Sequence, residues 1–433
     1  MIIGIDIGTT ALAGVLVDPA TLRVLETVSA PNPGDCPGLS AGRHEQDPLR
    51  IEAVFIDLVR RLMDASPEPV TGIAFSGQMH GVVAVDAGFN PLSPLITWQD
   101  QRGGALPETL LRHRFEERTG CRLHPGYGAA TVAADIRGGS FPGGCAFLLS
   151  IPGFLIARLT GRPVTDETFA ASWGIWDLPE RKWLAPLRDA LAIPDRLLPA
   201  VVSAGHPVGQ VDRGPAFLKG LTLFSPIGDN PAGVYAAQML YPGSVVLNLG
   251  TSGQLSAVIR DYRYDPSMET RPLPGFGFFQ TYATLCGGWA YAYLARFFQT
   301  VVREFAGVEL SPDALYGTMD RLASDDADGL MADTRFFGSR QADGCRGGAL
   351  AGISERNLQP GRLVTAFAEG IVDELARGCG IGSATAVVGL GNALRLNRSL
   401  RDAVERRLGV PCVIPDIDEM AAYGAARCAL EKG

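Results

Sequence analysis

Two Gly-Thr turns carry the residues of this sequence that are best suited to holding an anion. Gly8-Thr9-Thr10 separates apolar runs over residues 2–7 and 11–17, and Gly250-Thr251-Ser252 separates apolar runs over residues 245–249 and 255–259. Glycine lets the backbone approach an anion closely, while amides and hydroxyls of the turn point at its oxygens. One such hairpin is more often purely structural. Two copies predict two related units that each offer a phosphate-binding hairpin to a shared cleft.

Two aspartates accompany these turns. Asp6 precedes the first hairpin, where it could hold Mg²⁺ through water, because hard cations prefer oxygen ligands. Asp229 follows a predicted strand and precedes Pro231, so it could lie at a cleft edge, accept a hydroxyl proton and contribute to the metal site. Capping is the structural alternative: Asp6 could cap a turn, and Asp229 or Asn230 could cap the next helix. Asn230 fits the cap role directly, which leaves Asp229 for chemistry.

Two polar segments, at residues 76–81 and 98–102, follow other predicted strands. Planar polar groups beside an aromatic face suit a small polar ligand such as a sugar. His80 alone is more often a structural histidine and Trp98 alone is more often a core residue, so only the combination indicates a binding site. The candidate ligand-binding residues are Gln78, Met79, His80, Trp98, Asp100, Arg102, Asp229 and Asn230.

A glycine-rich turn near the C-terminus follows a predicted strand over residues 387–390. Gly389, Gly391, Asn392 and Asn397 are its candidate nucleotide-binding residues, because a flat base or a ribose can lie against such a turn. A helix should follow, capped by Asn397 or Ser399 and ended by Gly409. Small residues fill a last predicted helix over 419–430. They allow close backbone approach behind the nucleotide turn or simple helix packing.

The periodicity around these motifs predicts an α/β protein in two halves. Residues 2–7, 11–17 and 21–28 form a β-meander, Asp47-Pro48 opens a helix, and strands follow over 70–75 and 82–85. A second block should begin with a strand over 221–227 and a helix from Pro231 to about residue 240. We therefore expect domains over residues 1–220 and 221–433.

Composition narrows the functional classes. The chain has 433 residues, 46% of them hydrophobic, and a formal net charge of −8, which argues against a nucleic-acid or membrane-surface partner. The eight cysteines are scattered without zinc-like spacing, the start lacks a basic leader segment, and no uncharged run is long enough to span a bilayer. Reduced thiols, mostly in the core, and a cytoplasmic location are expected.

In this order the motifs DIGTT, SGQMHG, TWQDQR, GDNPAG with NLGTSG, and GLGNALRLN resemble the FGGY carbohydrate kinases over nearly the whole chain. The resemblance implies two actin/Hsp70/hexokinase-like (ribonuclease H-like) domains with a cleft between them, the first binding sugar and the second binding nucleotide. It assigns Asp6 to Mg²⁺, both hairpins to the phosphates of ATP, and Asp229 to the role of catalytic base. Met79, His80, Trp98 and Arg102 correspond to sugar contacts, and Gly389, Gly391, Asn392 and Asn397 fall in the adenosine segment.

The resemblance further implies transfer of the ATP γ-phosphoryl group to a primary hydroxyl of a ketose. Sedoheptulose is the first choice, from segments around residues 126–131 and 170–174, and xylulose is the second, since GDNPAG is closer to the xylulose-phosphorylating members. Pro231 and Gln101 depart from the usual pattern. The segments 126–131, 169–173 and 281–289 should set the pocket volume. Dimers are usual in the family, and the sequence leaves the oligomeric state open.

Two other classes of protein remain to be weighed. A non-catalytic sugar- or nucleotide-binding regulator on the same fold has no need of a base, which Asp229 would supply. An actin- or Hsp70-like ATPase with a macromolecular partner needs no small-sugar pocket, which the segments 76–81 and 98–102 would form.

Overall fold

The first sheet grows from a β-meander at the start of the chain. Strands β1 (Ile2–Ile7), β2 (Ala11–Val17) and β3 (Val24–Pro31) pair antiparallel, and β5 (Gly72–Gly77) lies parallel to β1. The order across this sheet is β13-β14-β5-β1-β2-β3, and β15 also pairs with β5. The remaining strands are β13 (Pro207–Gln210), β14 (Thr222–Phe224) and β15 (Ile227–Gly228). The computed structural model describes residues 1–112, 114–338, 347–378 and 382–432.

The second sheet repeats this plan. Strands β16 (Val245–Leu249), β17 (Gly253–Ile259) and β19 (Gly277–Thr284) pair antiparallel, and β22 (Val387–Leu390) lies parallel to β16. The order is β18-β19-β17-β16-β22-β23, with edge strands β18 (Glu269–Leu273) and β23 (Cys412–Val413). Since β19-β17-β16-β22 matches β3-β2-β1-β5 in order and direction, the duplication predicted from the two hairpins is confirmed.

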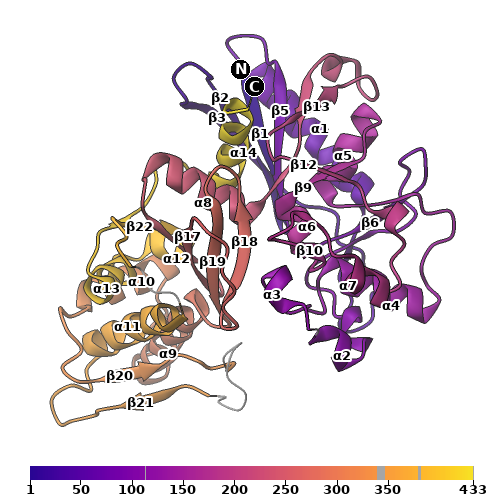
Figure 1. The fold of residues 1–433 in the computed structure, drawn as a ribbon. Helices are drawn as coiled ribbons and strands as arrows, with labels where there is room; N and C mark the ends of the chain where they lie inside the picture. The colour runs from indigo at the N-terminus through magenta and orange to yellow at the C-terminus, as the bar shows by residue number, and fades with distance from the viewer. Residues whose placement is uncertain (113, 339–346, 379–381, 433) are drawn as a thin grey trace.

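Two helices lie between the sheets and join the lobes (Figure 1). These are α8 (Asp229–Leu240) and α14 (Met420–Leu430), and their alanines pack with residues of both sheets, such as Val15 and Val246. Close approach depends on glycine, because a Cβ at Gly424 would lie 2.1 Å from the carbonyl oxygen of Ala232. The small residues of the last helix therefore serve helix packing rather than a nucleotide turn.

Further helices cover the outer faces. Asp47 caps α1 as predicted, since its side chain accepts from the amides of Leu49 and Arg50. The larger helices are α1 (Pro48–Asp64), α4 (Gly128–Gly138), α5 (Ile151–Thr160), α9 (Gly288–Ala306), α10 (Pro312–Leu322), α11 (Pro360–Gly378) and α13 (Arg398–Leu408). The shorter helices are α2 (Glu108–Leu111), α3 (Glu116–Thr119), α6 (Glu167–Ser172), α7 (Ala185–Ala190) and α12 (Asn392–Leu396).

Small two-stranded sheets complete the lobes. They pair β4 (Glu45–Gln46) with β7 (Leu95–Ile96), β6 (Val83–Val85) with β8 (Phe147–Leu149), β9 (Val164–Asp166) with β12 (Ala200–Val202), β10 (Trp176–Asp177) with β11 (Lys182–Trp183), and β20 (Met331–Asp333) with β21 (Ala349–Ala351). The β4–β7 pair matters for the site, because β4 carries Gln46, which bonds to the first hairpin, and β7 directly precedes the segment that holds Trp98.

Two local expectations were wrong, and a third was confirmed in position only. The strand expected over 221–227 is split into β14 and β15, and both pair with β5 in the first sheet instead of opening the second. Asn230 does not cap α8, because the helix begins at Asp229 and Gly228 occupies the cap. Asn397 holds the cap position of α13 without a capping bond, and Asp320 of α10 accepts from the amides of Arg398 and Ser399 instead. The domain boundary between residues 220 and 221 stays a prediction.

Six cysteines in the described part of the chain are free thiols, four of them buried; Cys345 and Cys379 lie outside the described residues. Among the residues that the structure describes, no helix is long and apolar enough to cross a membrane.

Substituting Gly424 with Val should destabilise the protein, because the new Cβ cannot fit against the backbone of α8. We expect the free energy of unfolding to fall by about 1–3 kcal/mol, as for other overpacked interiors. Chemical denaturation measures the loss. Gly317→Ala is the matched control, since Gly317 is also helical but has open space around it, and alanine there should leave stability unchanged or raise it. Equal behaviour of the two variants would contradict the packing argument.

Candidate active site

Asp6 and Asp229 meet at the carboxyl ends of adjacent parallel strands. In the strand register Asp6 lies beside Ser76 of β5, and Ser76 lies beside Ile227 of β15. Asp229 follows two residues after Ile227 and forms the first turn of α8. Carboxyl ends of parallel strands are the usual location of ligand sites in open α/β sheets. The sheet thus brings together the two aspartates that the sequence singled out separately.

The electrostatics of this pair are unfavourable without a counter-charge. Both residues keep some exposed surface, yet burial of the carboxyl groups raises both pKa values, and the neighbouring Asp229 raises the pKa of Asp6 further. The amide of Asn230 donates to Asp229 Oδ1 at 2.8 Å, and this bond opposes the rise in the pKa of Asp229. A raised pKa suits a group that must accept a proton near neutral pH.

Asp6 also fits a cation. Its Oδ1 atom is buried and has no hydrogen-bond partner among the residues that the structure describes. An unused carboxylate oxygen beside a second carboxylate is a suitable ligand for a hard divalent ion or its water. Within the same residues, no group of three or more His, Cys, Asp or Glu side chains gathers as a metal site. A magnesium ion held here would therefore draw most of its ligands from water and phosphate, which is how Mg²⁺ is usually bound in phosphoryl-transfer sites.

A hydrogen-bonded network ties the first hairpin to the two polar segments. The Thr9 hydroxyl donates to Gln78 Oε1 at 3.2 Å and accepts from Trp98 Nε1 at 3.0 Å. Gln46, from β4, accepts from Gln78 Nε2 at 2.9 Å and donates to the carbonyl of Thr9 at 2.8 Å. Gln78 and Trp98 therefore position the hairpin, and Trp98, 43% exposed, also presents an open aromatic face. Gln46 was missed by sequence reasoning, since only the β4–β7 pairing brings it here. Gly8 and Thr10 complete this turn.

Met79 and His80 follow β5 in the chain, and Met79 packs against Gly228 at the start of α8. Met79 is buried against Gly228, where a Cβ would come within 2.8 Å of its sulfur. His80 has a left-handed backbone, with φ of 72°, a conformation that costs energy in non-glycine residues and often accompanies function. Ser172 of α6 holds it there, because its hydroxyl accepts from the His80 amide at 3.1 Å.

Asp100 and Arg102 are saturated by contacts within the protein. Arg102 donates Nε to Asp100 Oδ1 at 2.9 Å and Nη1 to Asp135 Oδ2 at 3.0 Å, and it also binds Glu45. Asp100 accepts from the amide of His44 as well, and its hydrogen bonds with Arg102 hold its pKa below the usual value against the effect of burial. The network builds the loop that carries Trp98, so the geometry gives these two residues a scaffolding role. Direct contact with a ligand stays a prediction for them.

The second hairpin is braced by a helix N-terminus. The amides of Gly287 and Gly288, at the start of α9, donate to the carbonyls of Thr251 and Gly250 at 2.9 and 2.8 Å. A Cβ at Gly288 would lie 2.5 Å from the Gly250 carbonyl, so only glycine allows the contact. Gly250, Thr251 and Ser252 themselves are exposed. The hairpin is therefore held in place by the start of α9 while its three residues remain exposed.

A cavity of about 400 Å³ lies beside this hairpin in the second lobe. Asn392 and Asn397 line it together with Gly288 and with the rings of Tyr291 and Tyr316. Gly389 and Gly391 do not line it, and a Cβ at Gly391 would lie 2.6 Å from the carbonyl of Leu249. Their contact with a nucleotide stays a prediction. The tyrosines were missed because α9 and α10 reach the turn only in the folded chain.

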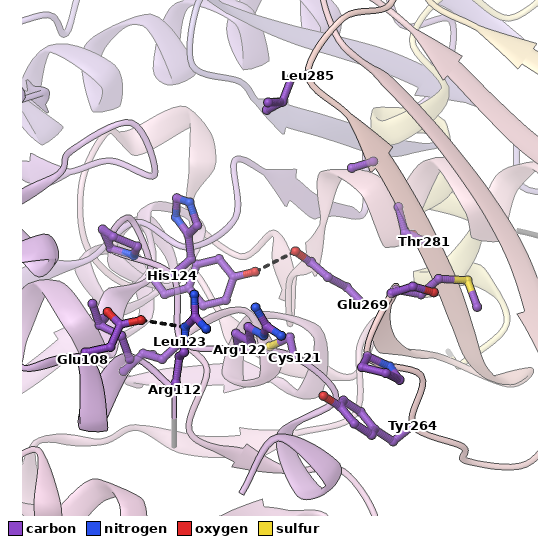
Figure 2. A pocket seen from close by; sticks show the side chains of 17 residues that line it. Glu108, Arg112, Cys121, Arg122, Leu123, His124, Tyr264, Glu269, Thr281 and Leu285 are labelled. Atoms are coloured by element: carbon purple, nitrogen blue, oxygen red, sulfur yellow. Dashed lines mark hydrogen bonds and ion pairs between the residues drawn. The ribbon is translucent and has the colours of Figure 1, made fainter. Parts of the chain in front are cut away.

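A larger cavity, of about 710 Å³, opens between the lobes (Figure 2). Its first-lobe wall includes Tyr127 and His124, and its second-lobe wall includes Glu269, Thr281 and Leu285. Two of the three segments expected to set the pocket volume, 126–131 and 281–289, thus contribute to its walls. The third segment, 169–173, includes most of α6 and does not line the cavity. Its Ser172 carbonyl bonds to the His80 ring, and its Ala171 carbonyl accepts from Arg271.

The buried carboxyl group of Asp166 helps to position Asp229 through Thr168 and Gly228. Asp166 caps α6 and accepts from the Thr168 hydroxyl at 2.9 Å, and that hydroxyl accepts in turn from the amide of Gly228 at 2.8 Å. Burial raises the pKa of Asp166 to about 7. The residue before Asp229 is therefore fixed by a fully buried chain of hydrogen bonds.

Replacing Asp6 with Asn should stabilise the free protein at high pH. Since the folded pKa of Asp6 lies above the unfolded value of about 4, the folded state retains a proton that the unfolded state has lost, and wild-type stability falls as pH rises from about 4 to the raised pKa. The variant lacks this loss. We expect it to gain on the order of 1 kcal/mol over wild type at pH 8 and much less at pH 5.

Urea denaturation at both pH values, without nucleotide or metal, measures the difference. Asp86→Asn is the control, because Asp86 is partly exposed and its hydrogen bonds with Asn90 lower its pKa, so this variant should show no gain at pH 8. An equal gain in stability for Asp6→Asn at both pH values would contradict a raised pKa of Asp6 in the folded protein.

Comparison with known proteins places this site in a family. Residues 1–233 match the family model described as the FGGY family of carbohydrate kinases, N-terminal domain. Sedoheptulokinase from Mus musculus is 28% identical over 99% of this chain and 97% of its own length, and the Homo sapiens sedoheptulokinase has the same identity and coverage. Xylulose kinase from Streptomyces coelicolor is 28% identical over 62% of this chain and 56% of its own length.

Solved structures share the whole architecture. The xylulose kinase of Lactobacillus acidophilus has a TM-score of 0.85 at 21% identity, covering 100% of this chain and 89% of that structure. At this identity the likeness establishes the fold, and it confirms the predicted actin/hexokinase-like α/β class. Because the family model spans more than half of the chain, the protein belongs to the FGGY family of carbohydrate kinases, enzymes that transfer a phosphoryl group from ATP to a sugar.

Proposed function

We propose that this kinase phosphorylates a primary hydroxyl of a ketose, with sedoheptulose as the first choice and xylulose as the second. The observation that carries the chemistry is the Asp6–Asp229 pair at the strand ends, with raised pKa values and an unused Asp6 oxygen. The choice of sugar rests on the two sedoheptulokinases, which match 99% of this chain, whereas the Streptomyces coelicolor xylulose kinase matches 62%.

In this proposal Asp229 is the catalytic base. It accepts the proton of the attacking hydroxyl, and its raised pKa lowers the energetic cost of that transfer near neutral pH. Asp6 would hold Mg²⁺, directly or through water, and the ion would supply positive charge to offset charge on the phosphates. Gly8, Thr9 and Thr10 on one side and Gly250, Thr251 and Ser252 on the other hold those phosphates in line. Such catalysis consists mainly of positioning and charge stabilisation.

The ketose and the nucleotide would enter from opposite lobes. Met79, His80 and Trp98 contact the sugar, with Gln78 holding the hairpin, and Asn230 lies next to the base. The adenosine lies in the cavity of about 400 Å³ against Asn392 and Asn397. Closure of the lobes would bring the two substrates together and exclude water.

Neither alternative class explains this arrangement as well. A binding-only regulator has no use for two strained carboxylates, and an ATPase with a macromolecular partner has no use for the Met79–His80 turn. The domain boundary at 220/221, the cytoplasmic location and a homodimer stay predictions.

Substituting Asp229 with Asn should abolish most turnover while the protein still folds and binds ATP. Loss of a general base typically costs about 10²–10⁴ in rate, so we expect kcat to fall by that factor in a coupled ADP-release assay with little change in nucleotide affinity. Asp18→Asn is the control, because Asp18 lies in the exposed β2–β3 turn. Retained turnover in Asp229→Asn would remove Asp229 from the role of base.

A panel of five-, six- and seven-carbon ketoses tests the choice of sugar. We expect sedoheptulose to give the highest kcat/KM and xylulose the next, because the two sedoheptulokinases match 99% of this chain and the Streptomyces coelicolor xylulose kinase matches 62%. The same coupled assay ranks the sugars, and ATP hydrolysis without sugar is the blank. Turnover confined to pentuloses would refute the preference for sedoheptulose, and sugar-independent hydrolysis would favour an ATPase.

A further inference from the structure

A buried cluster joins the two lobes beside His80. Its second-lobe members are Glu269 and Arg271 of β18, and its first-lobe members are Tyr127, at the start of α4, and the carbonyl of Ala171 in α6. Arg271 donates Nη2 to the Tyr127 hydroxyl and to Glu269 Oε2, each at 2.8 Å, and Nη1 to the Ala171 carbonyl at 2.8 Å. The guanidinium is only 3% exposed. It is therefore committed to a bridge between the lobes.

The bridge reaches His80 through an aromatic ring. The Tyr127 ring stacks on the His80 imidazole with centroids 4.3 Å apart and planes 6° from parallel. The Arg271 guanidinium lies 5.3 Å from the centroid of the same Tyr127 ring, within cation–π range. The Tyr127 hydroxyl donates to Glu269 Oε1 at 3.0 Å, which fixes the ring from its far end. Figure 2 shows this bond across the cavity.

His80 itself is held in one protonation state. Its Nδ1 atom lies 2.6 Å from the Ser172 carbonyl; because a carbonyl can only accept, Nδ1 carries the proton, which leaves Nε2 as the acceptor of the neutral ring. Burial, and next the Arg271 cation, lower the pKa of His80 to about 3. Glu269 acts in the opposite direction, and His124 acts in the same direction as Arg271.

We propose that Arg271 is a positioning residue that, from the second lobe, keeps His80 a neutral hydrogen-bond acceptor for a hydroxyl of the ketose. The proposal rests on the proposed function, in which His80 contacts the sugar. Its chemical content is that Nε2 accepts from a sugar hydroxyl only while the imidazole is neutral and stacked on Tyr127. Arg271 secures both conditions: its bonds hold Tyr127, and its positive charge opposes protonation of the ring. Ketose affinity thus depends on a residue of the lobe that binds the nucleotide.

Arg271→Met tests this directly, because methionine keeps much of the length and removes the cation and the hydrogen-bond fork. We expect KM for sedoheptulose to rise about tenfold or more at pH 7, the equivalent of one lost hydrogen bond, with KM for ATP changed less than about twofold. The rise should grow as pH falls, because without the Arg271 cation only burial and His124 oppose the imidazolium that Glu269 favours, so the ring takes up a proton at a higher pH than in wild type. Arg271→Lys, which restores the charge, should remove the pH dependence but not restore the full affinity.

Two controls separate positioning from folding. Arg263→Met alters an arginine just before β18 that donates to Gln280 instead of Tyr127, and it should leave KM for sedoheptulose unchanged. Tyr127→Phe removes only the hydroxyl; if Arg271→Met does not fold, this variant should still raise KM for sedoheptulose in the same direction by a smaller factor.

The titration of the His80 imidazole by NMR gives a readout that needs no sugar. The chain has five histidines, and a His80→Gln variant assigns the signal. In wild type we expect no titration of His80 above pH 5, and in Arg271→Met an upward shift of its midpoint. An unchanged titration and an unchanged KM for sedoheptulose in folded Arg271→Met would overturn the proposal. Failure of the wild type to phosphorylate any ketose would instead refute the proposed function, while the titration would still report on Arg271.

Discussion

The contact between α8 and α14 is the constraint on which the rest of the structure depends. These helices lie between the two sheets, and their backbones touch where Gly424 meets Ala232. Because α8 begins at Asp229, the same contact that joins the lobes also fixes the candidate base at the end of β15. Alanine and glycine dominate the interface, since a larger side chain on either helix would separate the sheets. The catalytic geometry is therefore built directly onto the interdomain packing.

The two carboxyl groups of the candidate site lack a positive counter-charge from the described part of the protein. Asp6 and Asp229 lie together with raised pKa values, whereas the guanidinium of Arg102 is already committed to three carboxylates, those of Glu45, Asp100 and Asp135. A protein of net charge −8 has no general attraction for a nucleotide. Binding of the polyphosphate must come from local amides, hydroxyls and a metal ion, which is the role proposed for the two hairpins and Asp6.

The two lobes also meet beside His80. Edge strand β18 binds the first lobe through Arg271 and Glu269, and its Thr270 amide donates to the carbonyl of Gly120 at 2.9 Å. A second-lobe strand thus forms part of the wall behind the proposed sugar contacts. The position of His80 depends on this contact between the lobes, because a movement of β18 would release Tyr127, which stacks on His80.

The sequence by itself determined the elements and the chemistry of single motifs. Apolar runs around the Gly-Thr turns predicted the first meander and the β16–β17 strand pair, Asp47-Pro48 predicted the cap of α1, and the duplicated hairpins predicted two related lobes, because these features depend on local backbone preferences and on periodicity. Their order along the chain was enough to indicate the kinase family. Asp6, Asp229 and the segments around His80 and Trp98 were found in the same way.

Only the tertiary structure decided which residues share a site and in what state. Gln46, Thr168 and Arg271 carry no motif of their own, and they matter because β4, α6 and β18 pack beside the strand ends. Conversely, the structure gives Arg102 a scaffolding network that its sequence motif did not show, and Asn230 was expected as a cap, whereas α8 begins two residues earlier than that cap implies. Hydrogen-bond saturation, burial and pKa depend on groups that are distant in sequence, so no local pattern could reveal them.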